Sequence, residues 1–150
     1  MTIYFGCDIP ADLYFHPEYD SWVRFEEDGT ATMGMTDVAQ TLAGKLLFIK
    51  FKEPGKVIKF GKIAATIESG KWIGPFVMPF DAEIIESNKK GFEKDILLAN
   101  KDPYGDGWLY KVKVDDPEEQ KKKLLTGDAA VEFYKKKIED NQIRCYRCVD

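Results

Sequence analysis

The sequence predicts a mainly β fold with short helices and a helical C-terminal appendage. Through the first three-quarters of the chain, short apolar runs alternate with turn residues, which is typical of many short strands rather than long helices. After these runs, charge-mixed segments place apolar residues at helical spacing. With 150 residues, of which 44% are hydrophobic, the chain can bury one sizeable core, so we expect a single domain over residues 1–150.

Strands are predicted where an apolar run is bounded by turn residues. The segments are Ser21–Phe25, Thr30–Gly34, Leu46–Phe51, Ile63–Glu68, Ala82–Ser87 and Trp108–Val114. Alternation in the last segment places Trp108 on one face with further apolar residues, which predicts that its ring is buried. Asp28-Gly29 lies between the first two segments, and because such a pair tolerates positive φ, we expect a hairpin turn at Glu26–Gly29.

Two short helices are expected within the β region. One spans Thr36–Leu42, with Thr36 as its N-cap and Gly44 just past its end. The other lies near Phe92–Ala99. Both are short enough to be connections between strands rather than the main layer of the fold.

The C-terminal part of the chain is predicted to be helical. Asp116 is expected to cap a helix that has Pro117 at its first position and Glu119 three residues after the cap. Gly127 then interrupts the helix, and Asp128 is expected to cap another. The apolar residues of this last helix recur at helical spacing, at Val131, Tyr134 and Ile138.

Charge and hydropathy exclude several classes of function. The formal net charge is −4, whereas nucleic-acid binding requires a clustered basic surface. The runs Lys121–Lys123 and Lys135–Lys137 lie in charge-mixed segments, where they form solvated helix faces. The sequence has neither the roughly 18 consecutive apolar residues of a membrane span nor a basic region followed by an apolar run at its start. We therefore expect a cytoplasmic protein without nucleic-acid or membrane partners.

One lysine stands in a setting that favours chemical modification. Lys71 follows an alternating strand and has turn residues on both sides. The segments Gly55–Glu68 and Val77–Asn88 are each expected to carry a strand, joined through Ser69–Phe76. A connection at the tip of two strands exposes the amine, which an acylating enzyme must draw into its own active site. The alternative is an ordinary solvated lysine in a turn.

The residues around Lys71 resemble the lysine motif of the glycine cleavage H proteins. In that family the motif is Glu-Ser-Val-Lys, and this chain has Glu68-Ser69-Gly70-Lys71. Further blocks agree in order and spacing, namely His16-Pro17-Glu18 with Trp22-Val23-Arg24, Gly34-Met35-Thr36-Asp37 with Ala39-Gln40, and Asn100 followed by DPYGDGW at 102–108. The resemblance covers about residues 14 to 135, and the combination of its motifs is specific. Residues 1–13 and 140–150 are expected to be extensions.

The resemblance implies a barrel-sandwich hybrid fold of the lipoyl, or hammerhead, type, with lipoate joined by an amide to Lys71. The arm of lysine plus lipoyl is on the order of 10–15 Å long when extended, so it can enter another protein. In the glycine cleavage system, glycine decarboxylase loads an aminomethyl group onto the arm, aminomethyltransferase unloads it, and dihydrolipoyl dehydrogenase reoxidises the arm. A lipoylating enzyme attaches the cofactor. The carrier is expected to be a monomer and to catalyse no step itself.

Roles for residues near the lysine follow from the same resemblance. Glu68 is expected to help the lipoylating enzyme recognise the hairpin, while Ser69 and Gly70 set the turn. His16, the single histidine of the chain, is expected either to touch the lipoyl group or to serve a surface or capping role. Biotin carriers use a similar hairpin, but their lysine lies in a Met-Lys-Met setting, which Gly70 and Trp72 do not match.

The chain departs from the family pattern around the lysine. Gly70 replaces the usual valine, Trp72–Phe76 replaces a small polar stretch, and Phe80-Asp81 replaces a Ser-Gly turn. Trp72 is expected either to pack under the hairpin or to contact a specific partner, since exposed aromatic residues favour interfaces. These changes leave the identity of the partner open, because specificity is a difference in affinity among partners.

The cysteines are the second departure. Cys7, Cys145 and Cys148 do not form an even disulfide framework, so we expect a fold that does not depend on disulfides. Cys145 and Cys148 have redox-motif spacing and flanking arginines, which favour thiolates. The alternative is a frayed tail with two reduced thiols. A metal site is not expected, because the three thiols would lack a fourth ligand.

Three functions therefore remain open. The first is the aminomethyl carrier of glycine cleavage. The second is an H-protein-like lipoate carrier of sulfur oxidation, whose partners are sulfur-transfer and heterodisulfide-reductase-like proteins; the altered lysine flank and the tail cysteines motivate it. The third is an unmodified interaction module or a lipoate-relay protein for other enzymes, and the intact Lys71 disfavours the unmodified form.

Overall fold

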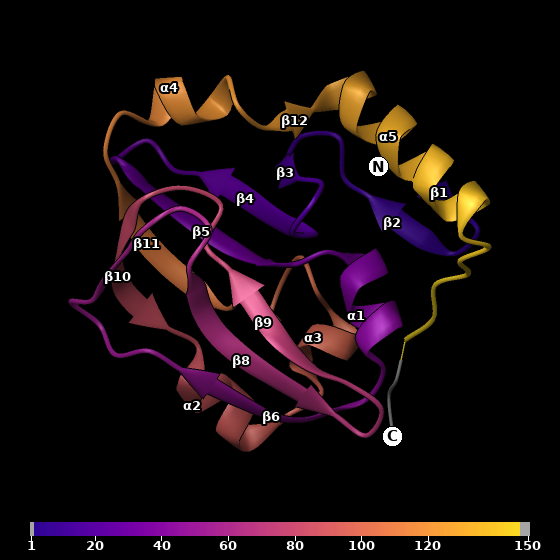
Figure 1. Ribbon diagram of the computed structural model, residues 1–150, viewed down its shortest axis with the longest axis horizontal. Coiled ribbons are helices and arrows are strands. Elements are labelled where there is room, and N and C mark those ends of the chain that lie inside the picture. The colour runs from indigo at the N-terminus through magenta and orange to yellow at the C-terminus, as the bar shows by residue number, and fades with distance from the viewer. Residues whose placement is uncertain (1, 148–150) are drawn as a thin grey trace.

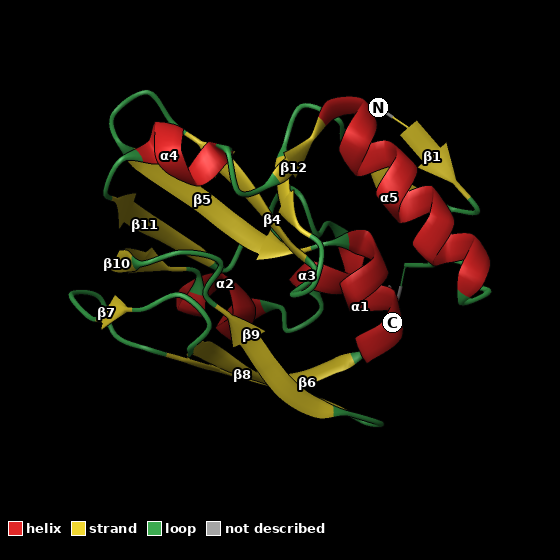
Figure 2. Ribbon diagram, turned by 45° about the horizontal axis from the view of Figure 1, so that its top comes forward, coloured by secondary structure: helices red, strands yellow, loops and turns green. Residues whose placement is uncertain are grey.

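The structure is a computed structural model that describes residues 2–147. Its larger sheet has the strand order β12 (Leu125–Thr126), β3 (Tyr14–His16), β4 (Ser21–Phe25), β5 (Thr30–Met35), β11 (Tyr110–Val114), β10 (Ala82–Ser87) and β7 (Val57–Ile58). The smaller sheet has the order β6 (Leu46–Phe51), β8 (Ile63–Ser69) and β9 (Ile73–Val77). Neighbouring strands are antiparallel in both sheets. Figure 2 shows the smaller sheet below the larger one.

One core fills the space between the two sheets. Both sheets contribute buried apolar side chains to it, among them Val23, Met33, Ala65, Ile67 and Phe76. Their burial removes apolar surface from water, at about 25 cal/mol per Å², and this holds the sheets together. The predicted mainly β class is confirmed, and the predicted strands correspond to β4, β5, β6, β8, β10 and β11.

Tyr110 also joins the two sheets by hydrogen bonds. Its hydroxyl donates to the carbonyl oxygen of Ala64 in β8 at 2.6 Å and accepts from the Lys52 N–H at 2.7 Å. Burial raises the pKa of Tyr110 to about 12. The phenol therefore stays protonated and remains a donor throughout the physiological pH range.

The hairpin turn between β4 and β5 forms as predicted. The Glu26 N–H donates to the carbonyl oxygen of Thr30 at 2.9 Å, and Gly29 has φ of +83°. The Asp28 carboxylate accepts from both the backbone N–H and the hydroxyl of Thr30, which lowers the pKa of Asp28. The turn is thus fixed by neighbours in sequence.

The last predicted strand begins later than expected. β11 starts at Tyr110, and Trp108 is only half-buried, so the prediction of a buried Trp108 ring is wrong. Trp108 still belongs to the preceding turn, because its N–H donates to the carbonyl oxygen of Gly105 at 3.2 Å. Leu109 is fully buried in its place.

The first helix forms at the expected position. α1 (Asp37–Ala43) is capped by Thr36, whose hydroxyl oxygen accepts from the Ala39 N–H at 3.1 Å. It ends at Gly44, which has φ of +82°, a value that L side chains rarely adopt. Both caps were readable from the sequence.

The helix predicted near residues 92–99 is instead two short helices. These are α2 (Lys89–Lys94) and α3 (Leu98–Lys101). Asp95 separates them with extended backbone, and its carboxylate accepts from the Leu97 N–H at 3.0 Å. Side-chain hydrogen bonding to the local backbone thus competes with the continuous helix.

The C-terminal helices agree with the prediction except at one cap. In α4 (Pro117–Lys121), the Asp116 carboxylate accepts from the Glu119 N–H at 3.3 Å. The longer helix α5 (Gly127–Asp140) follows Thr126 as its N-cap. The prediction that Asp128 caps α5 is wrong, because α5 already begins at Gly127. Asp128 lies in the first turn, where a carboxylate is favoured by the helix dipole.

A second buried cluster lies between α5 and the larger sheet. The helically spaced residues Val131, Tyr134 and Ile138 are buried in it together with Phe15 and Trp22. The predicted apolar face of the last helix is therefore confirmed. Within residues 2–147, no helix is both long and apolar enough to span a membrane.

The two ends of the chain are covalently joined. The strands β1 (Thr2–Tyr4) and β2 (Cys7–Ile9) form a hairpin, and Cys7 is disulfide-bonded to Cys145, 138 residues later. Figure 1 shows the yellow C-terminal tail running from the end of α5 past α1. Both expectations for Cys145, a reactive thiolate beside Cys148 and a reduced thiol in a frayed tail, are therefore wrong. Cys148, the other residue of the predicted redox pair, lies outside the described residues.

Candidate functional site

Lys71 lies at the tip of the hairpin formed by β8 and β9. Ser69 closes this tip, because its N–H donates to the carbonyl oxygen of Trp72 at 2.8 Å and its hydroxyl accepts from the Lys71 N–H at 3.3 Å. Lys71 is therefore one of two central residues of a tight turn, and it is exposed. The connection is shorter than the predicted Ser69–Phe76, because β9 already begins at Ile73.

Glu68 lies near the end of β8, and Gly70 lies in the turn that follows it. Glu68 pairs across the smaller sheet with Phe48 of β6 and with Ile73 of β9. Both partners are exposed, so this row lies on the outer face of the sheet. An added Cβ at Gly70 would meet no atom within 4 Å, and the φ of Gly70 is not positive. The turn therefore does not require glycine at this position.

The side chain of Lys71 passes over the end of α1. An added Cβ at Gly44 would lie 2.9 Å from Lys71 Cε. Gly44 thus ends α1 and also lets the aliphatic part of Lys71 lie close to the backbone. The site is built where the hairpin tip meets the connection between α1 and β6.

A cleft of about 450 Å³ opens beside the hairpin. Its walls come from β9, α1, β5 and the turn between β3 and β4, with lining residues that include Trp72, Phe76, Leu42, Met35 and Glu18. The ring of Trp72, which lies in the turn, folds over β9, because an added Cβ at Gly74 would overlap a ring carbon. Trp72 thus packs along the hairpin, yet 39% of its surface remains exposed.

Two buried amides support the loop under Lys71. Asn100 accepts from the Leu46 N–H at 3.0 Å and donates to the carbonyl oxygen of Gly44 at 2.9 Å and to the side-chain oxygen of Gln40 at 3.1 Å. Gln40 in turn donates to the Asp37 carboxylate at 2.8 Å. Each amide is fully buried with its polar atoms paired, so the network fixes the Gly44 loop rather than weakening the core.

The DPYGDGW segment is a structural turn beside this network. Its first residue, Asp102, accepts from the Gly107 N–H at 2.9 Å through its carbonyl oxygen. Tyr104 donates to the carbonyl oxygen of Asp8 at 2.8 Å and accepts from the Asp37 N–H at 2.9 Å. Burial raises the pKa of Tyr104 well above its ordinary value. The turn joins the N-terminal hairpin to the start of α1.

Comparison with known proteins identifies the family of this chain. The family model described as glycine cleavage H-protein matches residues 13–137. The chain belongs to this family. Its relatives include glycine cleavage system H protein 2 of Aquifex aeolicus, which is 45% identical over 142 residues and aligns with 95% of this chain and 88% of its own length. Glycine cleavage system H protein 3 of the same organism is 48% identical over 149 residues, with 97% and 92% covered.

An archaeal relative and a solved structure agree with the family assignment. The probable glycine cleavage system H protein 2 of Sulfolobus acidocaldarius is 40% identical, over 98% of this chain and 99% of its own. A crystal structure of a glycine cleavage system H protein from Mycobacterium marinum superposes with a TM-score of 0.68 at 28% identity, covering 90% of this chain and all, 100%, of that one. The barrel-sandwich fold implied by the motifs is thereby confirmed.

His16, which belongs to one of the family blocks, packs locally. Its ring stacks on Tyr19 with centroids 4.1 Å apart, and its Nδ1 accepts from the Tyr19 N–H at 3.3 Å. Partial burial lowers the pKa of His16. Tyr19 lines the cleft beside the hairpin, whereas His16 is not among the lining residues. These contacts are those of a local cap, and the expected contact of His16 with the lipoyl group stays a prediction.

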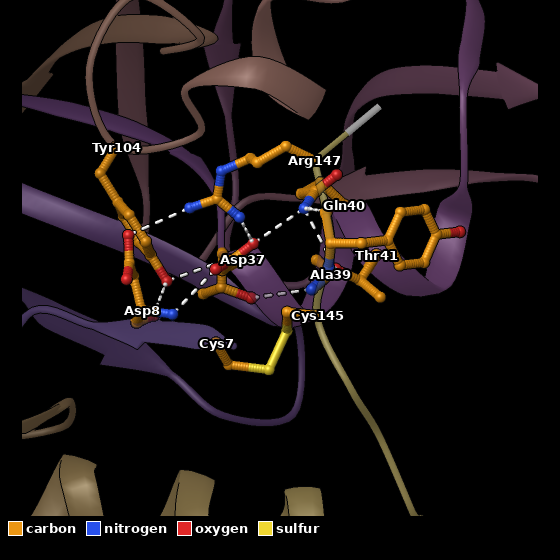
Figure 3. Close-up of a disulfide and its surroundings, with 11 residues drawn as sticks. Cys7, Asp8, Asp37, Ala39, Gln40, Thr41, Tyr104, Cys145 and Arg147 are labelled. Carbon is orange, nitrogen blue, oxygen red and sulfur yellow. Dashed lines mark hydrogen bonds and ion pairs between the residues drawn. A yellow bond between two sulfur atoms is a disulfide. The ribbon is translucent and has the colours of Figure 1, made fainter. Parts of the chain in front are cut away.

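Sequence analysis did not predict the residues that hold the C-terminal tail beside Lys71. Arg147 forms ion pairs with Asp37 and, at 3.0 Å, with Asp8. The carbonyl oxygen of Tyr146 accepts from Gln40 at 2.8 Å. Figure 3 shows Arg147, Asp37, Asp8 and Gln40 near the Cys7–Cys145 disulfide. The available signal was a cysteine near each end of the chain, with an aspartate after the first and an arginine after the second.

Proposed function

We propose that this member of the H-protein family is the lipoyl carrier of a glycine cleavage system, with lipoate attached to Lys71 Nζ. The observation that carries the proposal is the position of Lys71 at the exposed centre of a turn closed by Ser69 and Trp72. A short, hydrogen-bonded tip holds the amine in one place and presents it to another protein. Preorganisation of this kind lowers the entropic cost of binding.

The residues around Lys71 fit an attached lipoyl group. The amine is exposed for acylation, and an apolar cleft lies beside it for an alkyl chain. Glu68 lies three residues before the lysine on the outer face of the sheet, where a lipoylating enzyme can read it. Ser69 fixes the backbone at the lysine itself. Gly70 leaves space around the turn.

The chain contributes presentation and positioning to the reaction cycle. Lipoate attached there would supply a disulfide whose S–S bond breaks when one sulfur takes up the aminomethyl carbon and the other becomes a thiol. Lys71 carries this group between glycine decarboxylase, aminomethyltransferase and dihydrolipoyl dehydrogenase. Ser69 keeps the tip closed, and Asn100 holds the loop on which the lysine rests. In this proposal the carrier itself catalyses no step.

One of the two sequence observations that favoured a role in sulfur transfer does not hold in the structure. The spacing of Cys145 and Cys148 had suggested a dithiol in the tail, but Cys145 is bonded to Cys7. The relatives described above carry the name glycine cleavage system H protein. We therefore keep the aminomethyl carrier as the proposed function.

Intact-mass analysis tests the attachment site directly. Protein incubated with lipoate and a lipoylating enzyme should gain one lipoyl group, and Lys71→Arg should gain none. Lys45→Arg is the matched control, because Lys45 is an exposed lysine that lines a hollow together with Lys71. Peptide mapping should place the added mass on Lys71. Modification of another lysine, or equal loading of Lys71→Arg, would contradict the assignment.

The pathway needs a second measurement. Lipoylated protein should be loaded in a glycine-dependent manner when mixed with glycine decarboxylase, and aminomethyltransferase should unload it. Absence of loading, with intact lipoylation, would refute glycine cleavage while leaving the attachment site standing.

A further inference from the structure

The bond between Cys7 and Cys145 closes where the tail packs directly on the N-terminal hairpin. An added Cβ at Gly6 would lie 2.6 Å from the carbonyl oxygen of Cys145, so only glycine lets the two backbones approach this closely. The Cys145 N–H donates to the carbonyl oxygen of Phe5 at 3.0 Å. Cys7 is fully buried and Cys145 is 7% exposed. A reagent from solution therefore has little access to either sulfur after the tail docks, so the bond forms from a tail that is still open.

Besides the disulfide, the tail is held by hydrogen bonds and by one arginine. The carbonyl oxygen of Tyr146 accepts from Gln40 at 2.8 Å, and Arg147 pairs with the carboxylate of Asp37. A chain end held in this way can open locally while the rest of the domain stays folded. In the reduced protein, Cys145 is therefore the cysteine that can leave the interior, whereas its partner stays in β2.

Lys71 and the residue after Cys145 border the same open hollow. Its volume is about 410 Å³, and both Lys71 and Tyr146 line it. The arm of lysine plus lipoyl is on the order of 10–15 Å long when extended, so a group attached to Lys71 can meet Cys145 when the tail opens. A short tether also gives the attached group a millimolar effective concentration. Position therefore favours a reaction between the arm and the tail cysteine.

Charge distinguishes the two cysteines as nucleophiles. The attacking species in thiol–disulfide exchange is the thiolate, which neighbouring cations stabilise. Cys145 has Arg144 directly before it and Arg147 two residues after it, whereas Cys7 is followed by Asp8. Both arginines move with the tail when it opens. Cys145 is therefore the cysteine that attacks, and Cys7 is the one that completes the bond.

We propose that a lipoyl group on Lys71 is the oxidant that forms the Cys7–Cys145 bond of its own chain. The inference rests on the proposed attachment of lipoate to Lys71. The Cys145 thiolate attacks one sulfur of the dithiolane ring, whose S–S bond breaks as a bond to Cys145 Sγ forms. After the tail docks, Cys7 attacks Cys145 Sγ, and the bond to the arm breaks. The cysteines lose two electrons and two protons in total, and the arm gains them as a dithiol.

Burial makes the exchange run in one direction. A structural disulfide inside a fold has a lower reduction potential than an exposed or strained one, so electrons pass from the cysteine pair to the dithiolane. The reverse attack requires the sulfurs to leave the interior, and the finished bond holds the tail closed. Dihydrolipoyl dehydrogenase, which belongs to the proposed function, returns the arm to its disulfide. Lipoylation of Lys71 is thus followed by closure of the chain ends.

Peptide mapping of protein lipoylated without air tests the exchange. The variant Cys148→Ser, which keeps Cys7 and Cys145 as the two cysteines of the chain, is reduced and freed of reductant. It is then treated with lipoate and a lipoylating enzyme, and its thiols are alkylated in acid. Cys7 and Cys145 should be joined, and the alkyl groups should be on the arm of Lys71. Lipoylated chains with both cysteines alkylated would overturn the proposal, whereas a sample without added mass would refute the attachment of lipoate.

A matched donor and acceptor separate exchange within one chain from exchange between chains. Both carry Cys148→Ser. The donor is lipoylated protein with Cys7→Ser and Cys145→Ser, and the acceptor is reduced protein with Lys71→Arg, which has no arm. At about 10 µM of each, the acceptor should be oxidised about 100-fold more slowly than a lipoylated chain oxidises itself, because the tether supplies a millimolar effective concentration. Equal rates would overturn the intramolecular step.

The electron balance gives a second readout, independent of aminomethyl transfer. Dihydrolipoyl dehydrogenase and NAD⁺, added to the lipoylated Cys148→Ser protein, should produce one NADH per chain as the arm is reoxidised. The same protein with Cys145→Ser should produce none, because Cys7 alone cannot reduce the arm to a dithiol. NADH formation that persists in the Cys145→Ser protein would overturn the proposal. Exchange that occurs only when Cys148 is present would overturn the assignment of the attack to Cys145.

Discussion

The hairpin tip and the C-terminal tail border the same hollow but are held in place in opposite ways. At the tip, Lys71 is positioned by hydrogen bonds of Ser69 to residues two and three positions away. The tail is positioned by residues 106 to 138 positions away, namely Gln40, Asp37 and Cys7. Contacts between sequence neighbours hold the hairpin tip, whereas contacts between residues far apart in the sequence hold the C-terminal tail.

This difference separates presentation of the lysine from the surface around it. The tip needs only its own hairpin and the Gly44 loop beneath it, so the amine is presented whether or not the tail is in place. The tail adds Tyr146 to the surroundings of Lys71 and ties that surface to the stability of the whole fold. Changes in the tail should therefore alter stability strongly, while changes in the tip should alter it little.

The largest effect on stability is expected from the disulfide. Cys7→Ala with Cys145→Ala should lower the free energy of unfolding by about 3–5 kcal/mol, because the bond restricts the unfolded chain over a separation of 138 residues. Urea unfolding of the oxidised proteins measures this difference. A dithiol reductant should bring the wild type to the stability of the variant and leave the variant unchanged. Equal urea midpoints for the oxidised wild type and the variant would show that the disulfide does not stabilise the fold.

Loss of the tail ion pairs should have the next largest effect. Arg147→Met leaves the fully buried Asp37 carboxylate without its cation, and should cost about 2–3 kcal/mol, less than a fully buried pair because Arg147 is partly exposed. The matched control is Lys136→Met, which removes an exposed pair with Asp140 and should cost no more than about 0.5 kcal/mol. A cost for Arg147→Met as small as the control would show that the tail ion pairs do not hold it.

The same variant predicts a dependence on pH. Burial raises the pKa of Asp8, and Arg147 opposes this shift, so Arg147→Met should raise the pKa of Asp8 further. A carboxyl group with a raised folded pKa contributes stability when protonated and loses that contribution as pH rises through the folded pKa. The deficit of the variant should therefore be larger at neutral pH than at pH values below that pKa. Urea unfolding as a function of pH measures it, and a deficit that grows toward acid would contradict the assignment.

Local features of the fold could be read from the sequence because neighbouring residues determine them. The caps at Thr36 and Asp116 and the turn at Asp28-Gly29 follow from side chains that bond to adjacent backbone. The hairpin around Lys71 followed from a strand pattern, turn residues and a family motif. The break at Asp95 between α2 and α3 was missed, because an aspartate can also be tolerated inside a helix.

Contacts between residues far apart in the sequence could not be predicted from local patterns. The odd number of cysteines pointed away from a disulfide, whereas one pair forms between the two ends of the described chain. The pairing of Arg147 with Asp37 depends on where the tail crosses α1, which no local pattern encodes. Gln40 and Asn100 were recognised as parts of family blocks, but only the structure shows that they hold the Gly44 loop beneath Lys71.

A smaller effect is expected at the loop under the tip. Gly44→Ala should lower the free energy of unfolding by about 1–2 kcal/mol, because its backbone lies in a region that is nearly restricted to glycine. The new methyl group would also meet Lys71 Cε, but that flexible side chain can move away. Urea unfolding measures the cost, and lipoylation of Lys71 should persist. An unchanged stability would show that the loop relaxes freely beneath the lysine.

The smallest effect is expected at the tip itself, from Gly70→Val, which restores the residue usual in the family motif. An added Cβ at Gly70 would meet no atom within 4 Å, and its φ is not positive. The substitution should therefore change the free energy of unfolding by no more than about 0.5 kcal/mol, as at other exposed sites. Intact mass should still show one lipoyl group, because the Ser69 hydrogen bonds that close the turn involve no atom of the new side chain. If Gly70→Val proved as costly as Gly44→Ala, the tip would depend on glycine for its conformation. The tip would then not tolerate substitution, and its contrast with the tail, which is tied to the stability of the fold, would be wrong.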